Sequence, residues 1–178
     1  MIPLLLLRAL EFAARKHRDQ RSKGEEASPY INHLISVALL LAEIGGVTDT
    51  DILAAAILHD TLEDTDTTVE ELEAPFGVRI RKLVEEVTDD KTLPKYARKR
   101  RQIDHAEHLS ANAVLLKLGD KIANVVDVTR FPPASWSIDR RREYLEWAEA
   151  VVSNCPRVKA ALEQHFAQAL EEGRRKLL

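Results

Sequence analysis

Apolar residues recur at helical rather than alternating spacing along almost the whole chain, and this pattern limits the fold more than any other feature. In the first segment, Leu6, Leu7, Leu10, Ala13 and Ala14 form one stripe. Residues three and four positions apart share a face of an α-helix, whereas a half-buried strand needs strict alternation. Glycine, which interrupts helices, is scarce, with 6 residues among 178. The chain is therefore predicted to be all-α.

Capping residues, glycines and prolines predict where the helices begin and end. In the first half of the chain, helices are predicted from near Pro3 to about His17, from a Ser28 N-cap with Pro29 at the first position to Gly45, and from an Asp49 or Thr50 cap to Glu63. Two shorter helices follow, from Thr67 or Thr68 to about Gly77 and over 78–87. The remaining helices are predicted from Pro94 to Leu109, from Ser110 to Val128, from Ser137 or Asp139 to Asn154, and from Pro156 onward. A length of 178 residues suits one core. We expect a single compact domain over residues 1–178, with the helices of 138–178 packed on the rest.

Composition and charge exclude several classes of protein. The formal net charge is −3, 31% of residues are charged and 45% are hydrophobic, as in an ordinary soluble globular protein. The lone Cys155 has no internal disulfide partner and fits a reducing compartment. No stretch reaches the about 20 apolar residues of a membrane span, and no signal peptide frames the N-terminal leucines. We expect a soluble cytoplasmic protein that does not interact with a membrane.

The segment LHDTLED, residues 58–64, places four ionisable side chains directly after the apolar run ILAAAI. On a continuous helix, His59 and Glu63 are four residues apart, as are Asp60 and Asp64, so the four lie in two adjacent rows. Neighbouring carboxylates beside a buried face repel each other unless a cation or hydrogen-bond donors compensate them. The alternative is an ordinary amphipathic helix end whose charges reach water.

Two more polar residues each interrupt an apolar helix. His33 lies in PYINHLISVALLLA and Asp120 in AVLLKLGDKIANVV. Each residue also has a simpler explanation when it is considered alone. His33 is then a core histidine bonded to a carbonyl, and Asp120 is an aspartate paired with a neighbouring lysine. Together with His59 and Asp60 they supply imidazoles and carboxylates from three predicted helices. Such a set suits Mn²⁺, Fe²⁺, Zn²⁺ or a similar ion, with positions left for water and substrate.

The order His33, then His59 and Asp60, then Asp120 resembles the signature of the HD superfamily of metal-dependent phosphohydrolases. The segments PYINH, ILHDTLEDT, VEEVTDDKTLPK and KLGDKIAN resemble the (p)ppGpp hydrolase domain of RelA/SpoT proteins. The resemblance is greatest to the small alarmone hydrolases typified by the metazoan SpoT homologue, and it covers about residues 12–150. It implies the all-α fold of an HD domain.

The resemblance also implies a role for each residue that matches a family motif. The implied metal ligands are His33, His59, Asp60 and Asp120, with Mn²⁺ as the ion. The implied catalytic carboxylates are Glu63 and Asp64. The implied substrate contacts are Arg21, Lys23, Lys95, Asn124, Arg140 and Tyr144.

The function implied is Mn²⁺-dependent removal of the 3′-diphosphate from ppGpp or pppGpp, giving pyrophosphate and GDP or GTP, without a synthetase domain. Two alternatives stay open, namely hydrolysis of another 3′-phosphorylated nucleotide and nucleotide binding without turnover by a helical metalloprotein. The basic run KYARKRR is interpreted as a phosphate-attracting rim or a solvated face, because the chain is acidic overall. No nucleic-acid partner is expected, and the oligomeric state is not predicted.

Overall fold

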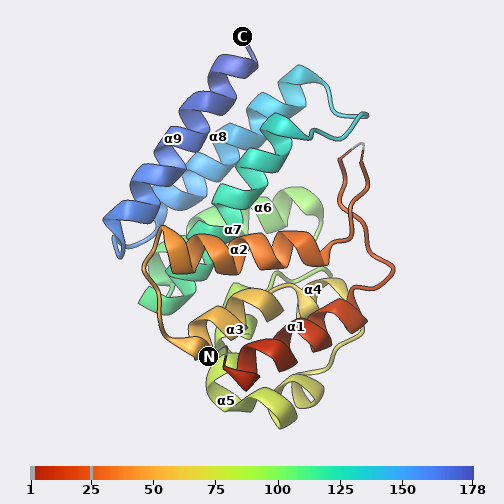
Figure 1. The fold of residues 1–178 in the computed structure, drawn as a ribbon. Helices are drawn as coiled ribbons and strands as arrows, with labels where there is room; N and C mark the ends of the chain where they lie inside the picture. Colours follow the sequence, from red (N-terminus) through yellow and green to blue (C-terminus); the bar gives the residue numbers. More distant parts are fainter. Residues whose placement is uncertain (1–2, 25) are drawn as a thin grey trace.

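A computed structural model describes residues 3–24 and 26–178. Within these residues all regular structure is helical apart from an isolated bridge between Arg21 and Pro29, which confirms the all-α prediction (Figure 1). The elements in chain order are α1 (Leu4–Lys16), α2 (Ile31–Glu43), α3 (Thr50–Leu58), α4 (Thr61–Asp64), α5 (Val69–Val87), α6 (Lys95–His105), the 3-10 helix η1 (Ala106–His108), α7 (Ala111–Arg130), α8 (Ile138–Asn154) and α9 (Ala160–Lys176). None of the helices in this part of the chain is both long and apolar enough to cross a bilayer.

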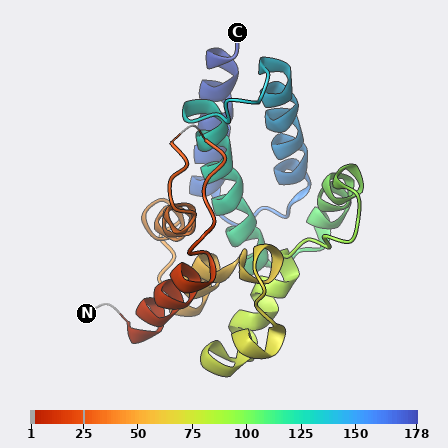
Figure 2. The same cartoon turned by 90° about the vertical axis from the view of Figure 1, so that its right-hand side faces the viewer.

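Helix α7 lies at the centre of the fold and packs against α2, α3, α5, α8 and α9. Figures 1 and 2 show α1, α3 and α5 grouped at one end of the molecule and α8 and α9 at the other, with α2 and α7 between them. A polar side chain on the inner part of α7 therefore lies where helices from both ends of the molecule meet. This is the position of Asp120.

The approach of α7 to α2 depends on a small residue next to Asp120. A Cβ atom at Gly119 would lie 3.1 Å from side-chain atoms of both Val37 and Leu41. Val37 and Leu41 are fully buried and belong to the same core as the apolar face of α7. This close packing brings the α7 backbone beside the helix that carries His33.

Several predicted helix starts are confirmed by their capping geometry. Asp49 accepts a hydrogen bond from the Asp51 N–H at the start of α3, and Ser110 and Ser137 cap α7 and α8 in the same way. Thr68 and Glu71 form a reciprocal capping box at the start of α5. Capping chemistry is local in sequence, and for this reason it can be predicted without the fold.

Two predicted helix starts are wrong. Ser28 does not cap α2, because its carbonyl accepts from the Ser22 N–H while the N–H of Tyr30 donates to the Gln20 carbonyl. These bonds pair the two arms of the loop before α2, which begins only at Ile31. The last helix begins at Ala160 rather than at Pro156.

The predicted continuous helix through residues 52–63 is also wrong, because the chain turns between α3 and α4. The ring Nδ1 of His59 lies 2.8 Å from the Ala56 carbonyl oxygen, and the hydroxyl of Thr61 donates to the Leu58 carbonyl at 2.6 Å. Side-chain donors thus bind carbonyl groups at the end of α3. Asp60, with φ −98° and ψ 0°, leaves the helical conformation at this point.

Thr61→Val is expected to lower the free energy of unfolding by about 1–2 kcal/mol, because the buried Leu58 carbonyl loses its donor in an otherwise isosteric change. Urea unfolding measures the difference. The matched control is Thr129→Val, since the Thr129 hydroxyl binds the Val125 carbonyl inside α7, where such a bond adds little stability. Equal losses in the two variants would contradict a special role for Thr61 in the turn.

Candidate functional site

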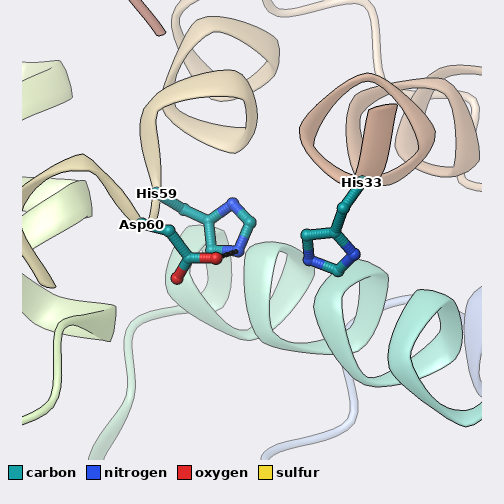
Figure 3. A group of neighbouring side chains, drawn as sticks. All are labelled: His33, His59 and Asp60. Atoms are coloured by element: carbon teal, nitrogen blue, oxygen red, sulfur yellow. Dashed lines mark ion pairs between the residues drawn. The ribbon is translucent and has the colours of Figure 1, made fainter. Parts of the chain in front are cut away.

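The structure brings together the four residues predicted as metal ligands. His33 comes from α2, His59 and Asp60 from the turn between α3 and α4, and Asp120 from α7. One possible ligand atom from each of His33, His59 and Asp60 lies within 4.8 Å of the others. Figure 3 shows these three side chains gathered over the ribbon of α7. Asp120 completes the group, since its Oδ1 lies 3.3 Å from His33 Nε2 and 3.6 Å from His59 Nε2.

The two imidazoles have the orientation that a metal site requires. Both rings are buried, and the Nε2 atom of each has no hydrogen-bond partner in the described residues. The Nδ1 of His59 is bound to the Ala56 carbonyl, which fixes the proton on Nδ1 and leaves a lone pair on Nε2. A buried polar atom is costly unless a hydrogen-bond donor, a water molecule or a metal ion binds it. The donor set therefore fits a divalent cation.

The charges in the cluster favour ionised carboxylates. Burial acts to raise the pKa of Asp60, but the neighbouring His59 outweighs it and the pKa falls below its ordinary value. Burial also opposes the charged form of Asp120, whose pKa is held well below the ordinary value by Lys121 and the two imidazoles. Burial would lower the pKa of His33, but contact with Asp120 raises it to about 9. A cation that binds His33 must therefore displace a proton.

Asp120 has a second set of partners that hold its carboxylate in place. Lys121 Nζ donates to Asp120 Oδ2 at 3.0 Å, and Asn124 Nδ2 donates to Oδ1 at 2.6 Å. The pairing with a neighbouring lysine, considered from the sequence as an alternative to metal binding, therefore occurs. The pairing with Lys121 involves Oδ2 of Asp120, whereas Oδ1 faces the imidazoles. Lysine pairing and metal binding by Asp120 are therefore compatible.

Glu63 lies one turn beyond the cluster and is partly buried. Its pKa is raised to about 7, first by burial and then by the nearby Asp89, Asp60 and Asp64. The backbone N–H of Asp89 donates to Glu63 Oε2 at 3.0 Å and opposes this rise. A carboxylate with a pKa near neutrality can exchange a proton under ordinary conditions, as a general base must.

In the metal-free protein, Glu63→Gln is expected to increase stability above pH 7 and to change it little below about pH 4.5. The folded state holds the Glu63 proton more tightly than the unfolded chain, so ionisation removes stability as the pH rises through about 7. The gain should be about 1–3 kcal/mol after allowance for partial exposure. Urea unfolding across this pH range, with a chelator present, measures it. Stability curves that run parallel at every pH would contradict the raised pKa.

Asp64 is held from both sides of its carboxylate. Gln20 Nε2 donates to Oδ2 at 3.0 Å, and Lys91 Nζ contacts Oδ1. Lys91 belongs to the turn between α5 and α6, and Gln20 to the segment after α1. The orientation of Asp64 thus depends on two segments that are far from it in sequence.

A cavity of about 520 Å³ opens beside the cluster and is lined by the candidate catalytic residues Glu63 and Asp64. Many of its other lining residues are cationic, including Lys23, Lys91, Lys95, Lys99, Lys121 and Arg140. Burial, followed by the charges of Arg140 and Lys23, lowers the pKa of Lys95, which is the result of bringing like charges together. Such a cavity suits a ligand with several negative charges.

A second cavity of about 670 Å³ lies on the other side of Tyr30, Asn124 and Tyr144, which line both cavities. Of the remaining predicted substrate residues, Lys95 and Arg140 line only the cationic cavity and Lys23 lines both. Arg21 lines only the second cavity, with its guanidinium bound to the Arg18 and Gln20 carbonyls. Arg21 is therefore the predicted substrate residue that lies outside the cationic cavity, although His33 also lines the cavity that contains Arg21.

Residues that were not assigned from the sequence also contribute to the site. The hydroxyl of Tyr30 donates to Asp60 Oδ2, and Lys121 lies over the ring of Trp147 at 4.6 Å while it binds Asp120. Tyr30 precedes His33 by three residues, a spacing that places both near one helix face and could have identified it. Lys91 and Trp147 carry no such local signal.

Comparisons with known proteins agree with this geometry. The chain matches the HD domain family over residues 9–145. It is 53% identical over 167 residues to guanosine-3′,5′-bis(diphosphate) 3′-pyrophosphohydrolase MESH1 of Mus musculus, covering 94% of this chain and 93% of that protein. It is 47% identical over 121 residues to the guanosine-3′,5′-bis(diphosphate) 3′-pyrophosphohydrolase of Aquifex aeolicus, covering 66% of this chain and 17% of that one. A solved structure, described as a metazoan orthologue of SpoT that hydrolyses ppGpp, is 41% identical with a TM-score of 0.94 and covers 100% of this chain and 99% of that chain.

Proposed function

The chain belongs to the HD-domain family, and we propose that it is a metal-dependent hydrolase that removes the 3′-diphosphate from ppGpp or pppGpp. The products are pyrophosphate and GDP or GTP. The observation that carries this proposal is the cluster of His33, His59, Asp60 and Asp120, of which the last three line a cavity that several lysines and arginines also line. The relatives with this name cover nearly the full chain and add support.

His33, His59, Asp60 and Asp120 are proposed to bind the cation, which we take to be Mn²⁺ because two imidazoles and two carboxylates suit that ion. When bound, a divalent cation supplies Lewis-acid stabilisation of phosphate charge and acidifies water. Asn124, Tyr30 and Lys121 hold the two carboxylates through their hydrogen bonds. These contacts support the ligand geometry in the way that residues behind metal ligands usually do.

Glu63 is proposed as the general base that takes a proton from the attacking water. Its Oε2 is bound by the Asp89 N–H, so Oε1 is the oxygen available for the proton. The pKa of about 7 lets Glu63 accept a proton near neutral pH and release it again. Asp64, held by Gln20 and Lys91, is proposed to orient the same water toward phosphorus.

The cationic residues are proposed to bind the phosphates, with Lys23, Lys95 and Arg140 as the predicted members of this group. Their charges neutralise the diphosphate and stabilise the negative charge on the leaving group. Arg21 is proposed to contact the nucleoside side of the substrate, because it lines only the second cavity. Asn124 and Tyr144 line both cavities and are proposed to contact the nucleotide where the cavities meet.

A single HD hydrolase domain remains the proposal for residues 1–178, with the motifs in about 12–150 and helices within 138–178 packed against them. The packing of α7 on α2 and α3 as well as on α8 and α9 supports it. A cytoplasmic location remains a prediction from the sequence.

Product analysis with ppGpp tests the proposed function directly. Protein loaded with Mn²⁺ should release pyrophosphate and GDP in equal amounts, and protein treated with a chelator should release neither. A panel of other 3′-phosphorylated nucleotides run in parallel measures selectivity. Turnover of another nucleotide without turnover of ppGpp would replace the proposed substrate and keep the hydrolase chemistry.

A further inference from the structure

We infer that His17 and Gln20 are positioning residues that fix the orientation of the Asp64 carboxylate through a chain of two hydrogen bonds. The inference rests on the proposed function, in which Asp64 orients the attacking water. Neither residue reaches the cluster of candidate metal ligands with its own hydrogen bonds. Their effect on the reaction would pass through Asp64.

The two hydrogen bonds have a defined direction. Gln20 Nε2 lies 3.0 Å from Asp64 Oδ2, and Gln20 Oε1 lies 2.6 Å from His17 Nδ1. An ionised carboxylate only accepts hydrogen bonds, so the NH₂ group of Gln20 must face Asp64. The amide oxygen then faces His17, whose Nδ1 must carry the proton. His17 therefore selects which end of the Gln20 amide points at Asp64.

His17 is suited to this role because it is rigidly held. Its residue is only 3% exposed, although it lies at the end of α1. Its backbone N–H donates to the Ala13 carbonyl at 2.9 Å, and its ring packs against Tyr30 with centroids 5.2 Å apart. A buried donor with few rotamers available costs little entropy to position.

Gln20 is anchored by its backbone as well as by its side chain. Its N–H donates to the His17 carbonyl at 2.9 Å, and its carbonyl accepts from the Tyr30 N–H at 3.1 Å. The same Tyr30 donates its hydroxyl to Asp60. Gln20 is thus bonded directly to Asp64 and is linked to the candidate ligand Asp60 through Tyr30, which sets the position of Asp64 relative to Asp60.

The opposite oxygen of Asp64 is less firmly held. Lys91, which contacts Oδ1, lies in a turn and its side chain is 49% exposed. Lys91 also lines the cationic cavity and is therefore available to a substrate phosphate. When a phosphate attracts Lys91, Gln20 is the partner that still holds Asp64.

Gln20→Met tests the first hydrogen bond, because methionine has nearly the same length and no donor. We expect kcat for ppGpp to fall about 10- to 100-fold, the loss that a misplacement of about 1 Å can cause, while KM changes less than about threefold. In an Asp64→Asn background the same change should have little further effect. Gln168→Met on the exposed face of α9 is the matched control, and its kcat should equal that of the natural protein.

Substitutions of His17 test the second hydrogen bond and separate positioning from stability. His17→Phe keeps the ring in the core but removes the Nδ1 proton, so kcat should fall while the melting temperature stays near that of the natural protein. His17→Asn restores an N–H near the Nδ1 position but leaves a cavity, so it should recover kcat at a lower melting temperature. If His17 had only a structural role, kcat would be higher in His17→Phe than in His17→Asn.

Unchanged kcat in Gln20→Met overturns the inference, as does a loss in His17→Phe that His17→Asn does not recover. If His17→Phe does not fold, the Gln20→Met result decides by itself. The natural protein run alongside keeps the two conclusions apart. If the natural protein releases pyrophosphate and the variants do so equally fast, only the positioning role is overturned. If the natural protein does not turn over ppGpp, the proposed function is overturned and this inference with it.

Discussion

Glu63→Gln is expected to hydrolyse ppGpp about 10²- to 10⁴-fold more slowly than the natural protein, the range lost when a general base is removed. The amide oxygen of Gln can still accept the Asp89 N–H, so the side chain should stay in place. The effect should fall on kcat, because Glu63 acts on water rather than on the phosphates. Initial rates of pyrophosphate release over a range of ppGpp concentrations measure it.

Asp64→Asn should lower kcat by a comparable factor if the two carboxylates act on one water. Bound Mn²⁺ should remain stoichiometric in both variants, since neither residue is among the proposed ligands. Glu171→Gln, at an exposed position on α9, removes one negative charge elsewhere and should change nothing. Natural rates in both active-site variants would show that the catalytic assignment is wrong even if the protein proves to be a hydrolase.

His59→Ala is expected to abolish both Mn²⁺ binding and activity. His59 Nε2 faces Asp60 and Asp120 at 3.1 and 3.6 Å, so without the ring the candidate site loses one of its two nitrogen ligands. The loss of activity should exceed the about 10- to 100-fold that follows when a residue behind a ligand is changed. Metal analysis after dialysis and ppGpp hydrolysis with added Mn²⁺ measure the two effects.

The metal-free protein should also be destabilised by His59→Ala, because removal of one partner leaves buried charge uncompensated. Thermal unfolding with and without Mn²⁺ distinguishes this loss from the loss of the cation, since the natural protein should gain stability from Mn²⁺ and the variant should not. His108→Ala is the matched control, as its side chain is 67% exposed. Stoichiometric Mn²⁺ in His59→Ala would exclude His59 as a ligand.

Much of the helical architecture could be predicted from local signals. The capping box at Thr68 and the caps at Asp49, Ser110 and Ser137 depend on residues two or three positions apart. The prediction at Ser28 is wrong because backbone hydrogen bonds pair the two arms of the loop before α2. The prediction at the α3–α4 turn is wrong because side-chain hydrogen bonds bind carbonyl groups at the end of α3. The periodicity of apolar residues shows neither kind of bond. At the turn, the pattern of a helix persists although the backbone leaves the helix at Asp60.

The candidate metal site shows the same division. His59 and Asp60 could be selected because ionisable residues directly follow an apolar run, and His33 and Asp120 because each is a polar residue that interrupts an apolar helix. Gln20 and Lys91 could not be selected, because no motif or spacing near either residue indicates that it contacts Asp64. A single surface glutamine or lysine is common on any soluble protein.

The helical class could be inferred from the amino-acid sequence alone, and the candidate metal ligands could be predicted from it, because periodicity, capping and the spacing of ionisable residues are properties of short segments. How these side chains face one another follows instead from the packing of the helices. The packing of α7 on α2 brings Asp120 within 3.3 Å of His33, and the segment after α1 brings Gln20 to Asp64. Such distances depend on how whole helices pack, and packing is a collective result of buried side chains far apart in the chain.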